Sequence, residues 1–75
     1  RIHVANVPDY GAEEVSDQAL ALLLGVVRRV ATRDRAVRAG AWNVSRREKM
    51  YRVAGRTLGL VGYGRIARTF ERKMR

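Results

Sequence analysis

Residues 57–67 read Thr-Leu-Gly-Leu-Val-Gly-Tyr-Gly-Arg-Ile-Ala, a short apolar run that leads into the pattern Gly62-x-Gly64-x-x-Ala67. In a dinucleotide-binding βαβ unit, a run of this kind is the first strand and the glycines form the turn into the next helix. Gly62 allows a sharp turn, and the missing Cβ of Gly64 lets a pyrophosphate approach the backbone. The stretch therefore predicts a strand over 57–61, a phosphate-binding turn and, directly after the motif, a helical stretch over Arg68–Arg75.

The first turn of the expected helix is suited to hold an anion. Its amide N–H groups have no acceptor inside the helix, and the helix dipole places partial positive charge there. The glycine pattern alone also occurs in ordinary turns. The nearly continuous apolar run before it favours a parallel strand that is buried on both faces. An acidic residue about 20 positions after the motif, which binds ribose hydroxyls, would lie beyond Arg75.

The chain has 75 residues, which is too few for a complete dinucleotide-binding domain. It begins with Arg1 rather than Met and stops within a helical pattern. We therefore expect a piece of a longer protein. The predicted fold class is α/β: a fragment of a Rossmann-type doubly wound parallel sheet with a long helix, an arm and the first βα unit. On its own the piece is expected to be helix-rich.

The residues before the glycine motif predict a short strand and a long helix. Ile2–Val7 has the β-branched, alternating pattern of a strand, and Pro8–Gly11 supplies a turn that ends it. Apolar residues then recur at helical spacing from Val15 to Val30. They cover more than one stripe of the helix, which predicts packing on two sides, against a sheet and against a second partner such as another subunit.

A shorter helix and an irregular arm are expected next. Asp34–Ala39 is helical in pattern, and Gly40 is suited to cap its end. The arm begins at Ala41–Asn43, where Trp42 is either part of a local core or an anchor at an interface. Ser45–Arg52 is arginine-rich and could be a loop or a short helix.

The composition excludes several classes of protein. No apolar run is long enough to span a bilayer, and no secretory leader is visible, so a cytoplasmic location without membrane contact is expected. The absence of cysteine rules out disulfides and cysteine-ligated zinc. His3 has no neighbouring metal ligand or catalytic partner, and the chain shows no acid–base pair. We therefore predict no catalytic and no metal-binding residue.

The net charge of +9 is unevenly distributed: residues 1–27 carry −3 and residues 28–75 carry +12. A basic half of this kind could attract nucleic acid, and a basic helical nucleic-acid-binding module is one alternative function. Fourteen of the sixteen cations are arginines that are scattered rather than clustered, and few aromatic residues could stack on bases. Solvated helix faces, partner contacts and attraction of a phosphate-bearing cofactor explain the charge better, and nucleic acid is not an expected partner.

Four motifs in order resemble the NAD-dependent D-2-hydroxyacid dehydrogenase family, which includes phosphoglycerate dehydrogenase and glyoxylate/hydroxypyruvate reductase. They are Val4-Ala5-Asn6-Val7-Pro8, the helix stretch that includes Glu14-Val15-Ser16-Asp17 and Ala19–Leu24 with Arg28-Arg29, Gly40-Ala41-Trp42, and Ala54–Ala67. The likeness covers nearly the whole chain and is far more specific than the glycine motif. Two positions depart from it: Ala67 stands for the commoner glycine, and Gln18 stands where relatives often have histidine.

This resemblance implies a place for each part of the chain. Residues 1–10 would end the substrate-binding domain, and residues 11–75 would form the incomplete N-terminal part of the NAD-binding domain. The long helix and the Trp42 arm would contribute to a homodimer. Cofactor-binding residues carried over from the family are the turn glycines Gly62 and Gly64, Tyr63 beside the phosphates, and the amides of Arg65 and Ile66 at the pyrophosphate.

The resemblance also implies a reaction. The parent protein is expected to transfer a hydride between NAD and a small D-2-hydroxy acid or 2-keto acid, with NADP not excluded. The family's catalytic arginine, acid and histidine lie after the glycine motif, so this piece alone is expected to be inactive. An NAD-sensing corepressor, or a dimerisation module on the same fold, is the other alternative function.

Overall fold

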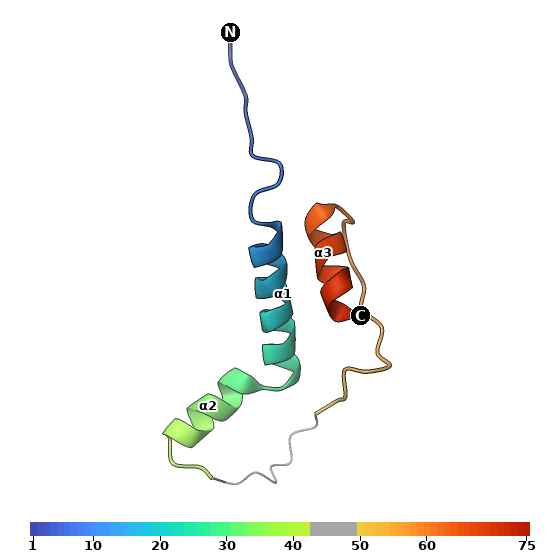
Figure 1. Ribbon diagram of the computed structural model, residues 1–75. Coiled ribbons are helices and arrows are strands. Elements are labelled where there is room, and N and C mark those ends of the chain that lie inside the picture. Colours follow the sequence, from blue (N-terminus) through green and yellow to red (C-terminus); the bar gives the residue numbers. More distant parts are fainter. Residues whose placement is uncertain (43–49) are drawn as a thin grey trace.

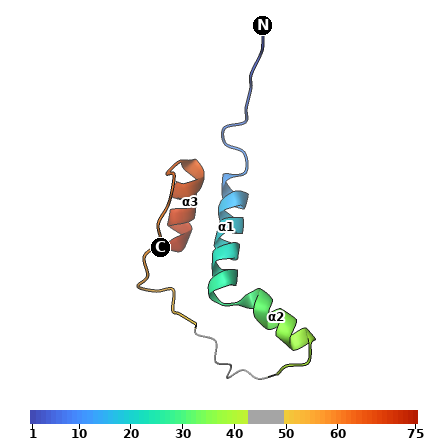
Figure 2. The same cartoon turned by 180° about the vertical axis from the view of Figure 1, so that it is seen from behind.

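The computed structural model describes residues 1–42 and 50–75, which form three helices. These are α1 (Ala12–Val27), α2 (Val30–Arg38) and α3 (Arg65–Met74). Helices α1 and α3 lie side by side, α2 leaves the far end of α1 at an angle, and residues 1–7 extend away from all three (Figures 1 and 2). Residues 50–64 lead to the start of α3, and the last part of this segment runs alongside that helix (Figure 1).

Helix α1 begins after the predicted turn. Residues 8–11 form that turn, and Gly11 takes a left-handed conformation with φ of 80° as the residue before the helix. Glu13 and Glu14 lie in the first turn of α1, where carboxylates interact favourably with the helix dipole. The turn and the start of the long helix therefore agree with the sequence pattern.

The prediction that the long helix continues to Val30 is wrong, because the chain bends at Arg28 and Arg29. Arg28 N–H donates to the carbonyl of Leu24 at 2.9 Å and closes α1. Arg29 then adopts φ of 55°, the left-handed region, which redirects the chain before Val30 starts α2. The apolar spacing runs unbroken across this bend, so periodicity did not reveal it. For the same reason the predicted start of the second helix at Asp34 is four residues late.

The predicted glycine cap of the second helix is confirmed. Gly40 has φ of 98°, and its N–H donates to the carbonyl of Val37 at 3.0 Å. Ala41 N–H donates to the carbonyl of Ala36 at 2.9 Å. Together these two bonds form a Schellman motif, which satisfies carbonyls at the end of α2.

Neither predicted strand forms within the described residues. Ile2–Val7 and residues 57–61 are irregular, and the first of these segments extends away from the second (Figure 1). A strand is stabilised by hydrogen bonds to a neighbouring strand, and the described part of the chain offers neither segment such a neighbour. The structure is thus helix-rich as expected, while the α/β character of the family's sheet is not visible in this piece.

The core lies between α1 and α3. Phe70 on α3 is buried, with 7% of its surface exposed, and Ser16 on α1 and Thr69 on α3 are buried with it. The chain as a whole is elongated, measuring 62 × 30 × 17 Å. Its radius of gyration of 17.8 Å compares with about 11 Å for a compact domain of this length. Most apolar side chains therefore lack a covering layer within the described residues.

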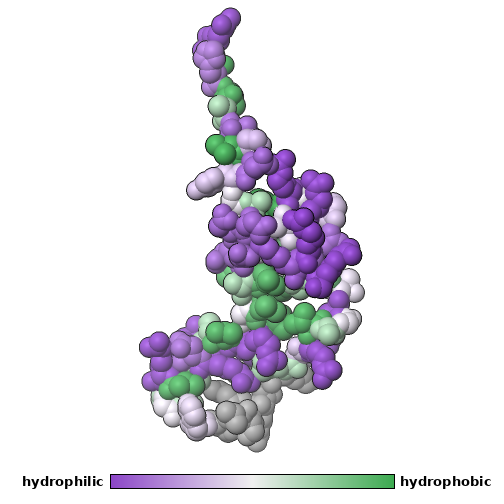
Figure 3. All heavy atoms as spheres, viewed as in Figure 1, coloured by the Kyte–Doolittle hydropathy of each residue, from purple (hydrophilic) through white to green (hydrophobic). Residues whose placement is uncertain are grey.

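One part of the uncovered apolar surface lies near the end of α1. Figure 3 shows apolar side chains gathered between α2 and the α1–α3 pair. A hollow of about 700 Å³ opens there, and Leu23, Val27, Leu58 and Met74 are among its lining residues. On the same helix Leu22 and Val26 are 60% and 76% exposed. The expected second packing partner of the long helix therefore stays a prediction.

Trp42 lies outside the local core. It is 83% exposed, so the interpretation as an ordinary core residue is wrong, and the interface anchor stays a prediction. Asn43 and most of Ser45–Arg52 lie outside the described residues, and the choice between loop and short helix is tested only at 50–52, which are irregular. None of the described helices has the length and apolarity needed to cross a membrane.

Candidate cofactor site

A helix follows the glycine turn as expected, but α3 begins at Arg65, directly after Gly64 and three residues before the expected stretch Arg68–Arg75. Gly64 is the N-cap residue, and the first bond inside the helix runs from Arg68 N–H to the Gly64 carbonyl at 3.0 Å. No side chain caps the helix. The amides of residues 65–67 therefore have no acceptor within the helix, and the dipole adds partial positive charge at this end.

The two glycines of the motif have different conformations, which separates their roles. Gly62 has φ of 92°, in the left-handed region that glycine adopts more readily than other residues. Gly64 has φ of −90° and ψ of −160°, an extended conformation open to any residue. A Cβ built on Gly64 would meet no atom within 4 Å. Gly62 is thus required by the turn, whereas Gly64 leaves space in front of the α3 amides.

A hollow of about 530 Å³ opens in front of this turn. It is bounded by the glycine turn and the first turns of α3 on one side and by the start of α1 on the other. Its lining residues are Pro8, Tyr10, Ala12, Ala19, Leu60, Val61, Gly62, Gly64, Arg65, Ile66, Ala67 and Phe70. The hollow reaches Gly64 and the first turn of α3, and the missing Cβ of Gly64 leaves room there for a diphosphate at the helix N-terminus.

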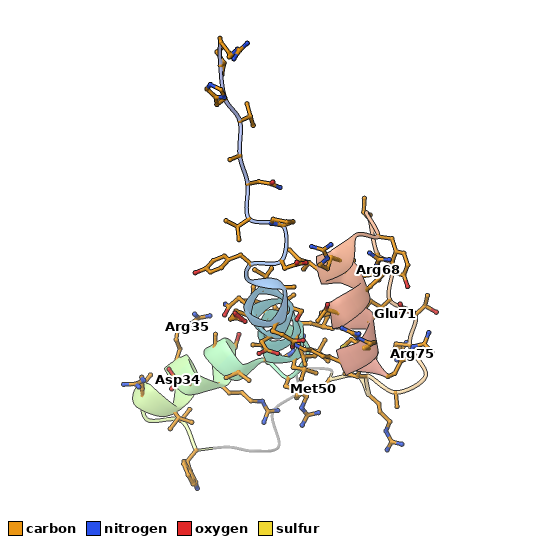
Figure 4. The ribbon with its side chains drawn as sticks, turned by 45° about the horizontal axis from the view of Figure 1, so that its top comes forward. Asp34, Arg35, Met50, Arg68, Glu71 and Arg75 are labelled. Atoms are coloured by element: carbon orange, nitrogen blue, oxygen red, sulfur yellow. The ribbon has the colours of Figure 1, made fainter. Side chains whose placement is uncertain are left out.

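Two arginine side chains of α3 lie close to the turn. Arg65 Nη1 donates to the carbonyl oxygen of Pro8 and forms an ion pair with Asp9 Oδ1. Arg68 Nε donates to the Gly64 carbonyl at 3.3 Å, and Figure 4 shows Arg68 at the end of α3 nearest the turn. Of these two cations Arg65 also lines the hollow, where its positive charge favours an anion.

Tyr63 lies outside the hollow. Its hydroxyl donates to Glu71 Oε2, and Arg75 Nη2 lies 2.8 Å from Glu71 Oε1. Glu71 and Arg75 extend from the side of α3 away from α1 (Figure 4). The hydrogen bond from Tyr63, and after it the bond from Arg75, lower the pKa of Glu71. The same bond to Glu71 raises the pKa of Tyr63. The tyrosine therefore braces the turn against the outer face of α3.

The far end of α3 is fixed to the start of α1 through Lys73. Its Nζ atom lies 2.8 Å from Glu13 Oε2 and 2.5 Å from Asp17 Oδ1, and donates to Ser16 Oγ at 2.7 Å. The bonds to Asp17 and then Glu13 raise the pKa of Lys73. With Phe70 packed on the same side, this cluster sets the direction in which α3 presents its first turn to the hollow.

Four of the five predicted site residues therefore meet at one place, and one does not. Gly62, Gly64, Arg65 and Ile66 line the hollow, while Tyr63 lies on another side of α3. Sequence reasoning missed the Lys73 cluster and the contact from Arg65 to the turn before α1. Only the charges of these residues could have indicated the two contacts, because each contact joins residues more than 50 positions apart and leaves no local sequence pattern.

The described residues hold no set of three or more histidine or acidic side chains placed to bind a metal ion. His3 lies exposed on the extended N-terminal segment.

Comparison with known proteins shows the family of the chain. Residues 20–75 match the profile of the D-isomer specific 2-hydroxyacid dehydrogenase, NAD binding domain. The chain is 45% identical over 75 residues to a glyoxylate reductase of Korarchaeum cryptofilum and 35% identical over 72 residues to glyoxylate/hydroxypyruvate reductase A HPR2 of Arabidopsis thaliana. A hydroxyphenylpyruvate reductase of Plectranthus scutellarioides is 37% identical over 65 residues.

These alignments cover 96%, 96% and 87% of the chain and 23%, 23% and 21% of the respective relatives. The chain thus spans about a quarter of the length of the curated relatives it matches. No solved structure matches the chain. The matches do not favour the corepressor-like, dimerisation-module or nucleic-acid-binding alternatives. The chain belongs to the D-isomer specific 2-hydroxyacid dehydrogenase family, in which residues 20–75 form part of the NAD-binding domain.

Proposed function

We propose that this chain supplies the pyrophosphate-binding part of an oxidoreductase that transfers a hydride between NAD and a small D-2-hydroxy acid or 2-keto acid. The observation that carries the proposal is the uncapped first turn of α3 behind Gly64. Residues of this turn line a hollow, and a Cβ at Gly64 would stand in open space with no atom within 4 Å. Gly62, Tyr63, Gly64, Arg65 and Ile66 are the proposed cofactor-binding residues.

The fit to a dinucleotide rests on the chemistry of these groups. A diphosphate is anionic and accepts several hydrogen bonds, and the amides of Arg65 and Ile66 donate without needing a neutralising side chain. Arg68 adds a cation beside the turn. When bound, the nicotinamide ring supplies the hydride. The contribution of this chain would be to hold the diphosphate at the first turn of α3.

The substrate class follows from the relatives. They are named as reductases of glyoxylate, hydroxypyruvate and hydroxyphenylpyruvate, which share a carbonyl carbon next to a carboxylate. Reduction of such a 2-keto acid takes up one hydride from NADH and one proton, and it releases NAD⁺ and the 2-hydroxy acid. The proton donor and the carboxylate-binding group are not proposed among residues 1–75, so this piece alone is expected to be inactive.

The organisation of the whole protein belongs to the same proposal. Residues 1–10 would end a substrate-binding domain, and residues 11–75 would begin the NAD-binding domain. The extended course of residues 1–7 away from the helices supports a boundary near the turn at 8–11. Exposed Trp42 and the uncovered apolar side chains of α1 support a homodimer through these elements. A cytoplasmic location is part of the proposal.

The test is an activity measurement on the whole protein that contains this chain. NADH or NADPH is mixed with glyoxylate, hydroxypyruvate or hydroxyphenylpyruvate, and the loss of reduced-cofactor absorbance is followed. We expect turnover of at least one of these acids and a preference for NADH. Binding of neither cofactor, measured by fluorescence titration, would refute the proposal. Binding without turnover of any 2-keto acid would refute the substrate class.

A further inference from the structure

The side chain of Arg65 reaches back from the glycine turn to the residues that precede α1. A single nitrogen, Nη1, donates to the carbonyl of Pro8 and is paired with Asp9 Oδ1. Arg65 and Pro8 are 57 positions apart in the sequence. The contact therefore joins two segments that meet only in the folded protein, on opposite sides of the 530 Å³ hollow.

The guanidinium keeps further donors available. Arginine carries five N–H donors in a rigid fork, two of them on Nη1. The Pro8 carbonyl and the Asp9 carboxylate both contact Nη1. Among the described residues, none accepts a hydrogen bond from Nε or Nη2 of Arg65. The side chain is 53% exposed and borders both the glycine-turn hollow and a neighbouring hollow lined by Arg68 and Arg72. One nitrogen of the Arg65 guanidinium is thus held by the residues before α1, and the other two nitrogens can still donate to a ligand.

We propose that Asp9 is a positioning residue for the cofactor, acting through Arg65. Asp9 and the Pro8 carbonyl hold Nη1, so that the remaining N–H groups of the fork meet the diphosphate that lies on the α3 amides. This inference rests on the proposed NAD site. It adds a link between the turn before α1, where the domain boundary is proposed, and the phosphates of the cofactor.

The physical reason is preorganisation. A free arginine side chain has many rotamers, and ordering it lowers the affinity of any ligand that it contacts. An arginine already held by a carboxylate loses less entropy when the phosphate binds. The charge of Asp9 itself repels an anion, so the two effects have opposite signs. Because Asp9 is 80% exposed, solvent weakens its repulsion of the anion, and we expect the ordering effect to be the larger.

A double-mutant cycle separates these effects. Asp9→Ala removes the acceptor at an exposed site, so it is expected to leave the melting temperature unchanged. The dissociation constant of NADH, measured by fluorescence titration of the whole protein, is expected to rise about threefold, the range for one exposed ion pair. In an Arg65→Ala background the same Asp9→Ala change is expected to have no effect, because Asp9 then has nothing to position.

Asp34→Ala is the matched control. Asp34 Oδ2 forms an exposed ion pair with Arg38 at 3.0 Å on α2, remote from the glycine turn, and its loss is expected to leave the NADH affinity unchanged. An unchanged or tighter affinity in Asp9→Ala would overturn the positioning role, as would an equal loss in both backgrounds. If the wild-type protein binds no NADH, the proposed function itself fails. If the wild type binds and Asp9→Ala binds equally well, only the positioning role fails.

Discussion

The Nζ atom of Lys73, near the end of α3, lies 2.7 Å from the Oγ atom of Ser16, a side chain of α1 with no exposed surface. Ser16 Oγ donates in turn to the Glu13 carbonyl at 2.9 Å. The buried hydroxyl thus accepts from one helix and donates within the other. This relationship fixes α3 against α1 at the end opposite the cofactor turn, and the direction of the uncapped first turn depends on it.

Replacement of Ser16 by alanine is expected to destabilise the protein. The change removes one acceptor of Lys73 and one donor to the Glu13 carbonyl in a site closed to water. The free energy of unfolding is expected to fall by about 1 kcal/mol, the usual net value of a lost hydrogen bond. Denaturant unfolding measures it, with Thr57→Ala at an exposed loop position as the control. Equal losses in both variants would show that Ser16 has no special role.

Alkaline stability is expected to depend on Lys73. Its pKa is raised from the ordinary 10.5, first by the hydrogen bond to Asp17 and then by that to Glu13. A raised folded-state pKa gives stability that is fully present below 10.5 and is lost as pH rises through the folded-state value.

We therefore expect the difference in stability between the wild type and Lys73→Met to shrink as pH rises above 10.5. Urea unfolding at a series of pH values measures this difference. Tyr63 also has a raised pKa, but it is present in both proteins, so its contribution to the pH dependence of stability cancels in the difference. A difference that stays constant across that range would show that the charge of Lys73 does not stabilise the helix pair.

Removal of the Tyr63 hydroxyl is expected to change the titration of Glu71. The hydrogen bond from Tyr63 is the main cause that lowers the pKa of Glu71 below its ordinary 4.5. In Tyr63→Phe this pKa is expected to rise toward the ordinary value, and a smaller lowering from Arg75 remains. NMR titration of the carboxylate measures it. Tyr51→Phe is the control, because Tyr51 lies under the Arg56 guanidinium and not near Glu71. No change in Tyr63→Phe would show that the hydrogen bond is absent in solution.

The Gly62→Ala variant is expected to strain the turn. Gly62 has φ of 92°, and a Cβ there would meet no atom within 4 Å, so the cost comes from backbone conformation and not from a clash. We expect a loss of about 1 kcal/mol in the free energy of unfolding. Thermal unfolding compares it with Gly59→Ala, whose backbone is outside the left-handed region and whose Cβ would also be free. Equal stability of the two variants would contradict the turn geometry.

Much of the fold near the site could be predicted from local sequence. The glycine spacing fixed where α3 begins, and Gly40 fixed where α2 ends, because both depend on the conformation of one or two residues. The strand predicted at 57–61 does not form among the described residues, since a strand needs hydrogen-bonding partners that are distant in sequence. The bend at Arg29 was also missed, because an arginine with positive φ leaves no mark in a hydrophobic pattern.

The candidate site also contains some features that local sequence predicts and others that it does not. Gly62, Gly64 and the amides of the α3 first turn were predictable because their role lies in the main chain. The Lys73 cluster and the Arg65 contact with Asp9 were not, since ion pairs between distant residues are specified only by the packing of α3 on α1. Tyr63 was expected beside the phosphates from the family likeness, yet its hydroxyl bonds to Glu71. Its role at the cofactor stays a prediction.

The central claim is that Gly64 leaves room for a diphosphate on the amides of α3. The most direct measurement is the dissociation constant of NADH for Gly64→Ala in the whole protein, beside Gly59→Ala. Alanine fits the φ of −90° at Gly64, so the melting temperature is expected to stay at the wild-type value. We expect the dissociation constant to rise about tenfold or more for Gly64→Ala and to be unchanged for Gly59→Ala. Wild-type affinity in a folded Gly64→Ala protein would contradict the account.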